Sequence, residues 1–155
     1  MSLEYTIARR IRTALEADAD IAPHLLPDVL NPSEQTGRLE EAARVQEMLV
    51  AVTVQPAEPV APEREGFPSR GYARAVTAIT ILAKRELNES AHEAVCTMQD
   101  RCLRVIIDEF ANGGDTYCPE LSDLADVDTN GTRLPADMVG RQFLLSSTMF
   151  FSPHE

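Results

Sequence analysis

The sequence lacks the segments and motifs that mark secreted, membrane-spanning and nucleotide-binding proteins. Its start, Ser2–Tyr5, has no basic stretch, so we expect no signal peptide. No apolar run approaches the roughly 20 residues that a membrane-spanning helix needs, so we expect no contact with a membrane. There is no glycine-rich phosphate loop and no Gly-x-Ser-x-Gly motif. Tyr5, Tyr72 and Tyr117 are too dispersed for a base-stacking platform.

Cysteine is scarce, and none of it forms a Cys-x-x-Cys motif. Cys96, Cys102 and Cys118 make an odd number, which favours reduced thiols in a protein assembled in the cytoplasm. His92 and Cys96 have the four-residue spacing of a metal-ligand pair, but no second pair is near, so packing at a sheet edge is the interpretation we favour. A Cys–His nucleophile built on Cys118 is conceivable, without a supporting motif.

Positive charge is also scarce, with 14 basic against 25 acidic residues and a formal net charge of −11. This negative net charge argues against a protein that binds nucleic acid through its phosphates. No nucleophile, base and orienting group converge in the sequence, so we expect neither an enzyme nor a cofactor. The 155 residues are enough for one domain, 1–155, with a two-layer core.

The most informative stretch is a strand, Tyr72–Lys84, that leads into an amphipathic helix, Ser90–Ala111. Ser90 and Glu93 have the spacing of a capping box at the start of this helix. One face carries an apolar stripe at three- and four-residue spacing: Val95, Met98, Cys102, Val105, Ile106 and Phe110. A helix with one apolar stripe needs a sheet to pack on, and we expect Met98, Cys102 and Ile106 to face it.

The remaining periodic segments supply a second helix and two further strands. Helical spacing predicts a helix over Ser2–Ala17, and alternation predicts strands at Met48–Gln55 and Met138–Phe151. Residues 18–32, with three prolines, read as an irregular connection. Arg38–Glu47 is left open between a short helix and the early part of the following strand. The predicted fold is α+β, a mainly antiparallel sheet of three strands with two principal helices packed on it.

Two segments are predicted to be irregular. Residues 112–137 form an acidic loop, and residues 56–71 form a long proline-rich arm at the tip of a hairpin. Arms of this composition are either spacers or docking elements. The candidate interface residues come from this arm and from the first helix: Glu58, Glu63, Arg64, Phe67, Arg70, Arg9 and Arg12.

The basic middle of the first helix, Arg9, Arg10 and Arg12, has two interpretations. A solvated helix face is the ordinary one, and a contact with an acidic partner is the sharper one.

A stretch of the acidic loop resembles the first half of a calcium-binding loop. Asp126, Asp128 and Asn130 place oxygen atoms at alternate positions, Gly131 follows, and Asp137 occupies the twelfth position. The alternative is a tight Asn-Gly turn in a surface loop, which we favour because the segment lacks the final glutamate and the exit helix. The sequence therefore contains a weak calcium candidate and no other metal site.

The order of elements resembles the tail terminator (tail-completion) proteins of long-tailed phages. Ile11–Leu26 is similar to the end of that family's first helix, Thr77–Glu109 to its strand-to-helix unit, and Arg141–Phe151 to its closing strand. The resemblance implies a structural protein of the virion, at the head-proximal end of the tail and assembled in the host cytoplasm.

In that family, a homohexameric ring caps the tail tube, ends its polymerisation and meets the head connector or neck protein. Six copies at −11 each carry about 66 negative charges, which lets DNA pass through the lumen without specific binding. Two alternatives stay open: a head-closure or neck protein of the same head–tail interface, and a small acidic metal-binding or regulatory module unrelated to phage.

Overall fold

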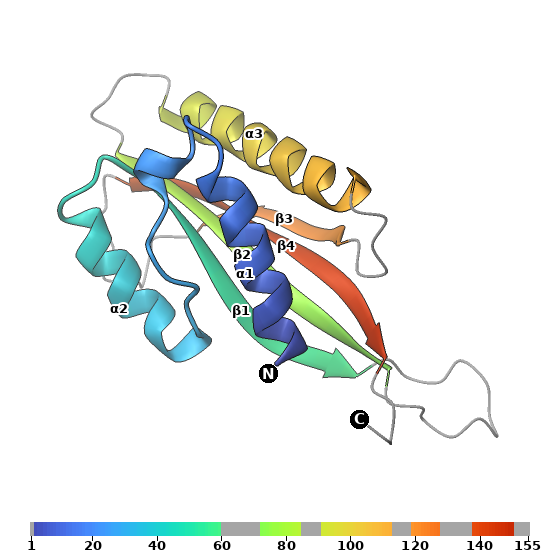
Figure 1. Cartoon of the computed structure of the whole chain (residues 1–155). Helices are drawn as coiled ribbons and strands as arrows, with labels where there is room; N and C mark the ends of the chain where they lie inside the picture. Colours follow the sequence, from blue (N-terminus) through green and yellow to red (C-terminus); the bar gives the residue numbers. More distant parts are fainter. Residues whose placement is uncertain (1, 60–71, 85–90, 113–118, 128–137, 151–155) are drawn as a thin grey trace.

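The computed structural model describes residues 2–59, 72–84, 91–112, 119–127 and 138–150 (Figure 1). The elements in chain order are α1 (Leu3–Glu16), the short 3-10 turn η1 (Ala22–His24), α2 (Pro32–Ala43), β1 (Met48–Pro59), β2 (Tyr72–Lys84), α3 (Ala91–Asn112), β3 (Glu120–Asp126) and β4 (Met138–Phe150). The fold is α+β, as the sequence predicts. None of the described helices is both long and apolar enough to cross a membrane.

The sheet is antiparallel between all neighbouring strands, in the order β1-β2-β4-β3. Three of these strands lie where alternation and apolar content predict them, and β2 has the predicted bounds. The fourth, β3, corrects the prediction that residues 112–137 are irregular. All seven of its residues are exposed, so the sequence lacks the apolar alternation that marks a half-buried strand.

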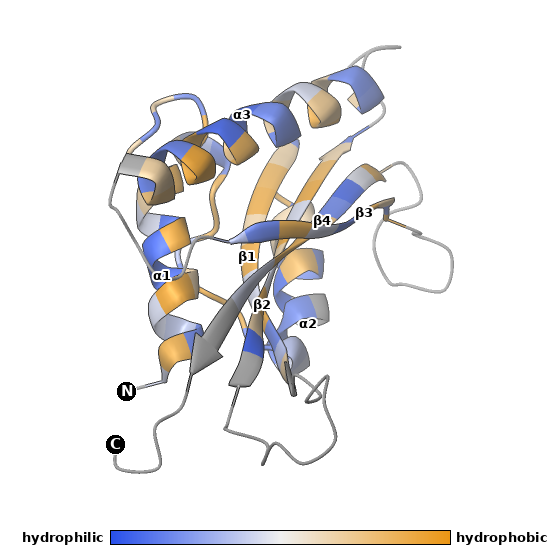
Figure 2. Cartoon of the chain, turned by 90° about the vertical axis from the view of Figure 1, so that its right-hand side faces the viewer, coloured by the Kyte–Doolittle hydropathy of each residue, from blue (hydrophilic) through white to orange (hydrophobic). Residues whose placement is uncertain are grey.

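Helices cover both faces of the sheet (Figure 2). On one face, α1 and α3 pack their apolar sides over the centre of β1, β2 and β4. The largest fully buried side chains of this layer are Ile11, Leu15, Ile21, Ile79, Ile81, Ile106, Phe110 and Phe143. Each buried aliphatic or aromatic side chain contributes about 1.5–3 kcal/mol through removal from water, so this layer is the principal core.

The second face is covered by α2, which settles Arg38–Ala43 as helix but begins earlier than predicted. Pro32, interpreted as a breaker, is the first residue of a helix that runs to Ala43. The Asn31 side chain caps this helix by accepting a hydrogen bond from the Glu34 amide at 2.9 Å. Proline suits this first position because no intrahelical partner exists there for an amide hydrogen. Leu39 and its neighbours then pack on Leu49 and Leu82.

Ion pairs join α3 to α1 and to the turn that follows α1. Arg10, in the middle of α1, bonds to Glu109 near the end of α3 at 3.2 Å and lies over the Phe110 ring, 4.3 Å from its centroid. Arg101, in the middle of α3, bonds to Asp18 and Asp20 just after α1, each at 2.9 Å. These contacts fix the crossing of the two helices over the sheet.

The apolar stripe of α3 packs on the core as predicted, although two of its members are only partly buried. Cys102 and Ile106 are buried against the sheet, whereas Met98 and Val105 are partly buried. The predicted cap, Ser90, lies outside the described residues. The predicted arm is shorter than 56–71 at its start, because β1 continues to Pro59 and pairs Glu58 with Arg74.

Candidate functional site

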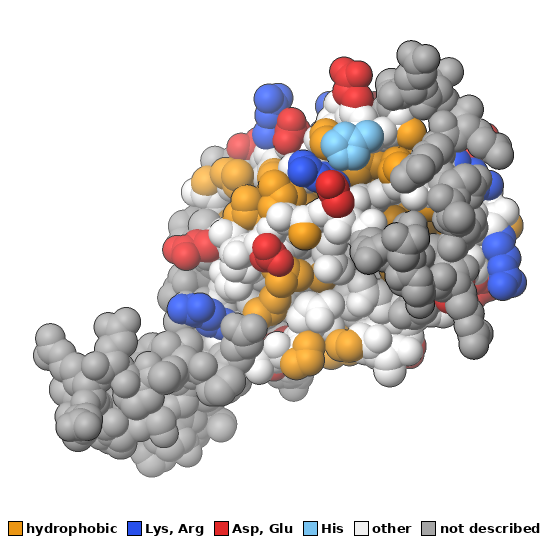
Figure 3. All heavy atoms as spheres, turned by 180° about the vertical axis from the view of Figure 1, so that it is seen from behind, with side chains coloured by type: hydrophobic (Ala, Val, Ile, Leu, Met, Phe, Trp, Pro, Cys, Tyr) orange, Lys and Arg blue, Asp and Glu red, His pale blue; other side chains and the backbone are white. Residues whose placement is uncertain are grey.

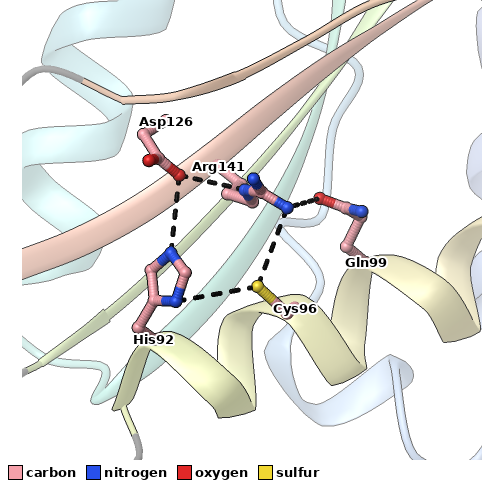
Figure 4. Close-up of polar contacts among 5 residues, drawn as sticks. All are labelled: His92, Cys96, Gln99, Asp126 and Arg141. Carbon is pink, nitrogen blue, oxygen red and sulfur yellow. Dashed lines mark hydrogen bonds and ion pairs between the residues drawn. The ribbon is translucent and has the colours of Figure 1, made fainter.

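Five polar side chains meet where the start of α3 crosses the ends of β3 and β4 (Figure 4). The helix supplies His92, Cys96 and Gln99, which share one face because they are three and four residues apart. Asp126 is the last residue of β3, and Arg141 is its direct partner on β4. The register of the sheet and the helix spacing together build this polar cluster.

Arg141 is the centre of the polar cluster. Its Nε donates to Asp126 Oδ1 at 2.9 Å, and its Nη1 donates to Gln99 Oε1 at 3.5 Å and to Cys96 Sγ at 3.7 Å. His92 lies on the outer side, with Nδ1 3.9 Å from Cys96 Sγ and Nε2 3.5 Å from Asp126 Oδ1. The contacts therefore run from the thiol through the imidazole to the carboxylate, with the guanidinium bridging both ends.

The charges of the cluster support one another. The hydrogen bond from Arg141 holds the pKa of Asp126 below its ordinary value, and His92 adds to this effect. The same hydrogen bond raises the pKa of Arg141. Both groups therefore stay ionised around neutral pH.

Three members of this cluster are candidates from the sequence alone, but in other roles: His92 and Cys96 as a packing pair, and Asp126 as a candidate calcium ligand. His92 and Cys96 were expected to pack at a sheet edge, and they do lie beside the outer pair of strands, with Cys96 half-buried. Arg141 and Gln99 were missed. The signal for Arg141 was present in β4, since it shares the inward face with Phe143 and Leu145, where a charge needs a partner.

The calcium-loop prediction remains untested. Its first residue, Asp126, is bonded to Arg141 and His92, and the other candidate ligands (Asp128, Asn130, Asp137) lie outside the described residues. Within the described part of the chain, no group of three or more His, Cys, Asp or Glu side chains is placed to hold a metal ion.

The interface candidates separate into internal and outward-facing groups. Arg12 donates from Nε to the Leu26 carbonyl at 3.0 Å and from Nη1 to Glu16 at 2.9 Å, so it braces the chain that follows α1. Arg9 is exposed and lies 5.4 Å from the centroid of the Tyr5 ring. The basic middle of α1 is therefore only partly a solvated face, because Arg10 and Arg12 contact other parts of the chain.

Arg9 and Arg12 also line a groove of about 840 Å³ between α1 and α2, together with Arg38. The arm candidates Glu63, Arg64, Phe67 and Arg70 lie outside the described residues. Of Glu58, only the backbone position in β1 is described.

The two edges of the sheet differ. The outer edge of β1 is covered by the connection before α2: Leu26 N donates to Val50 O at 2.9 Å, Leu30 N donates to Val52 O at 2.9 Å, and Val54 N donates to Leu30 O at 2.8 Å. At the opposite edge, no described strand pairs with the outer side of β3.

Apolar side chains lie exposed on β3 and on α3. Leu121 and Leu124 on β3 are 50% and 40% exposed, and Ile107 on α3 is 58% exposed. The space-filling view shows apolar patches between charged groups on this side of the molecule (Figure 3). The pairing of β3 has an irregularity between Leu121 and Asp123, and β3 carries three acidic side chains. Both features disfavour non-specific pairing of this edge with strands of other proteins.

No protein-family model matches the sequence, and no curated protein matches it.

Proposed function

We propose that this protein is a structural component of a phage tail that forms a homohexameric ring and caps the tail tube. The observation that carries the proposal is the asymmetry of the sheet. One edge, β1, is hydrogen-bonded to the chain's own connection over Val50–Val54. The other, β3, has no strand partner on its outer side among the described residues, and it carries two exposed leucines. One such open edge favours head-to-tail contacts between different surfaces, and contacts of this kind close into rings.

Two further features support the proposal. The three segments that resemble tail terminators, Ile11–Leu26, Thr77–Glu109 and Arg141–Phe151, correspond in this fold to α1 with the following turn, to β2 and α3, and to β4. The net charge of −11 per chain gives the ring an acidic lumen through which DNA passes without adhering. In this role the partners are the tail tube protein and a head connector or neck protein.

The test is ring formation by the purified chain, alone and mixed with tail tubes, observed by electron microscopy. The double variant Leu121→Lys/Leu124→Lys places two charges at the open edge and should abolish rings. Val45→Lys is the matched control, since Val45 is 81% exposed at the end of α2, far along the sheet from β3. It should leave ring formation unchanged.

Each result has a distinct meaning. Rings from wild type and Val45→Lys but not from the β3 variant support the proposal. Normal rings from the β3 variant would show that the contact between subunits does not use β3. A wild-type chain that forms no rings, with or without tubes, would contradict the proposed function.

A further inference from the structure

We propose that Cys96 is a reactive thiol that undergoes exchange with small disulfides, with His92 accepting its proton. The inference does not depend on the ring proposal. It rests on the line of contacts from Cys96 Sγ to His92 Nδ1 at 3.9 Å and from His92 Nε2 to Asp126 Oδ1 at 3.5 Å (Figure 4). This order of nucleophile, base and orienting carboxylate is the arrangement that activates cysteine nucleophiles.

The contact with Asp126 assigns the imidazole tautomer. Because the Asp126 carboxylate only accepts, His92 Nε2 carries the hydrogen that faces it, and Nδ1 is left as an acceptor for the thiol proton. Asp126 thus acts through His92, as a positioning residue.

The sulfur also faces a positive charge. Arg141 Nη1 lies 3.7 Å from Cys96 Sγ, on β4, and faces the negative charge that proton transfer leaves on sulfur. Glu93 and Asp100 are one helical turn away on α3, exposed to water, where their opposing effect is screened. Arg141 is therefore the charged group in direct contact with the sulfur.

Cys102 provides an internal comparison. It is fully buried on the same helix, and burial raises its pKa to about 12, so it remains a protonated, inaccessible thiol. Cys96 is half-buried, beside a His92 side chain that is 58% exposed, so a small reagent has access to the sulfur.

The step is balanced with a disulfide RS–SR as the co-reactant. The Cys96 proton passes to His92 Nδ1, and the thiolate attacks one sulfur of the disulfide. A Cys96–S–SR bond forms as the RS–SR bond breaks. Cys96 is oxidised to a mixed disulfide, one half of the reagent is reduced, and the departing RS⁻ takes up the proton that His92 releases.

The experiment measures the rate at which the folded chain reacts with dithiobis(nitrobenzoate), and with neutral dithiodipyridine to separate reactivity from attraction of an anion. Every protein carries Cys118→Ser, because Cys118 lies outside the described residues. We expect one fast thiol per chain, faster than glutathione and lost in Cys96→Ser, and one slow thiol, Cys102. His92→Gln and Arg141→Gln should each slow the fast thiol about tenfold.

Matched controls separate this role from a general effect on the fold. His24→Gln and Arg104→Gln alter the same residue types elsewhere and should leave the rate unchanged. Arg141→Lys keeps the charge and should retain most of the rate. Melting temperatures identify any variant that has unfolded, and His92→Gln, at an exposed position, is the variant that keeps the test decisive.

Either of two results would overturn the inference. One is a Cys96 thiol that reacts no faster than glutathione. The other is a Cys96 thiol that reacts at the wild-type rate in both His92→Gln and Arg141→Gln.

Discussion

Three arginines connect α3 to its neighbours. Arg10 reaches it from α1, Arg141 reaches it from β4, and Arg101 extends from it to Asp18 and Asp20. Their side chains are 25–47% exposed, and water screens ion pairs at this exposure, so they add little to the free energy of unfolding. They orient the helix, while the apolar residues beneath it supply most of its stability.

Substitutions on the two faces of α3 should therefore lower the free energy of unfolding by different amounts. Ile106→Ala removes a side chain that is 1% exposed and should lower the free energy of unfolding by about 2–5 kcal/mol. Arg104→Ala, on the solvent side, should cost well under about 1 kcal/mol. Urea denaturation measures both, and equal losses would mean that α3 is oriented differently.

The Asp18–Arg101 pair predicts how stability depends on acid. The hydrogen bond from Arg101 lowers the pKa of Asp18 in the folded chain. Its contribution is therefore complete above the unfolded-state pKa of about 3.9 and is lost as the pH falls through the lower folded-state pKa. Asp18→Asn should therefore flatten the loss of stability as the pH falls below about 4.

Asp108→Asn, an exposed carboxylate on α3, is the control for this titration. If both variants lose stability on acidification as steeply as wild type, the Asp18 pair makes no pH-dependent contribution.

At the scale of elements, two glycines occupy opposite environments. A methyl group at Gly37, in the exposed part of α2, would meet nothing within 4 Å, whereas one at Gly140, in β4, would overlap Leu82 and lie 2.8 Å from the Ile81 carbonyl oxygen. Gly37→Ala should therefore stabilise the chain by about 0.5–1 kcal/mol through helix propensity. Gly140→Ala should destabilise it by about 1–3 kcal/mol through overpacking.

Thermal unfolding followed by circular dichroism distinguishes the two substitutions. If both substitutions shifted the melting temperature in the same direction, helix propensity at Gly37 and close packing at Gly140 would not explain their effects on stability.

The elements that the sequence predicts are those whose burial pattern is regular. β1, β2, β4, α1 and α3 each present a continuous apolar face, so their period is visible in the chain. The sequence leaves Arg38–Glu47 open between a short helix and a strand, and it misplaces the start of α2 because Pro32 is interpreted as a breaker, although an asparagine cap followed by proline is also a helix start. β3 has no buried residue, and only its pairing with β4 makes it a strand.

The polar cluster, too, could be predicted from the sequence only in part. His92 and Cys96 are neighbours on one helix, so their spacing in the sequence predicts that they lie together. Arg141 and Asp126 come to them only through the sheet, and no local pattern records that contact.

At the scale of the whole molecule, the arm beyond β1 can be removed without disturbing a described pairing. Replacing residues 61–70 by a short glycine-serine turn keeps Pro59 paired with Ala73 and should leave the melting temperature within a few degrees. If the arm docks on a neighbouring subunit or the tube, the same variant should form no rings and leave overlong tails. Tails of normal length would make the arm a spacer.

The sheet order β1-β2-β4-β3 also has a kinetic consequence. β1 with β2, and β3 with β4, are neighbours along the chain and can form as hairpins with short-range contacts. The central β2–β4 pairing joins Lys84 to Met138 across the whole of α3 and β3, so it requires the largest loop closure. Refolding should therefore be limited by the docking of the two hairpins beneath α3, and substitutions at the β2–β4 interface should slow folding more than those at the outer pairs.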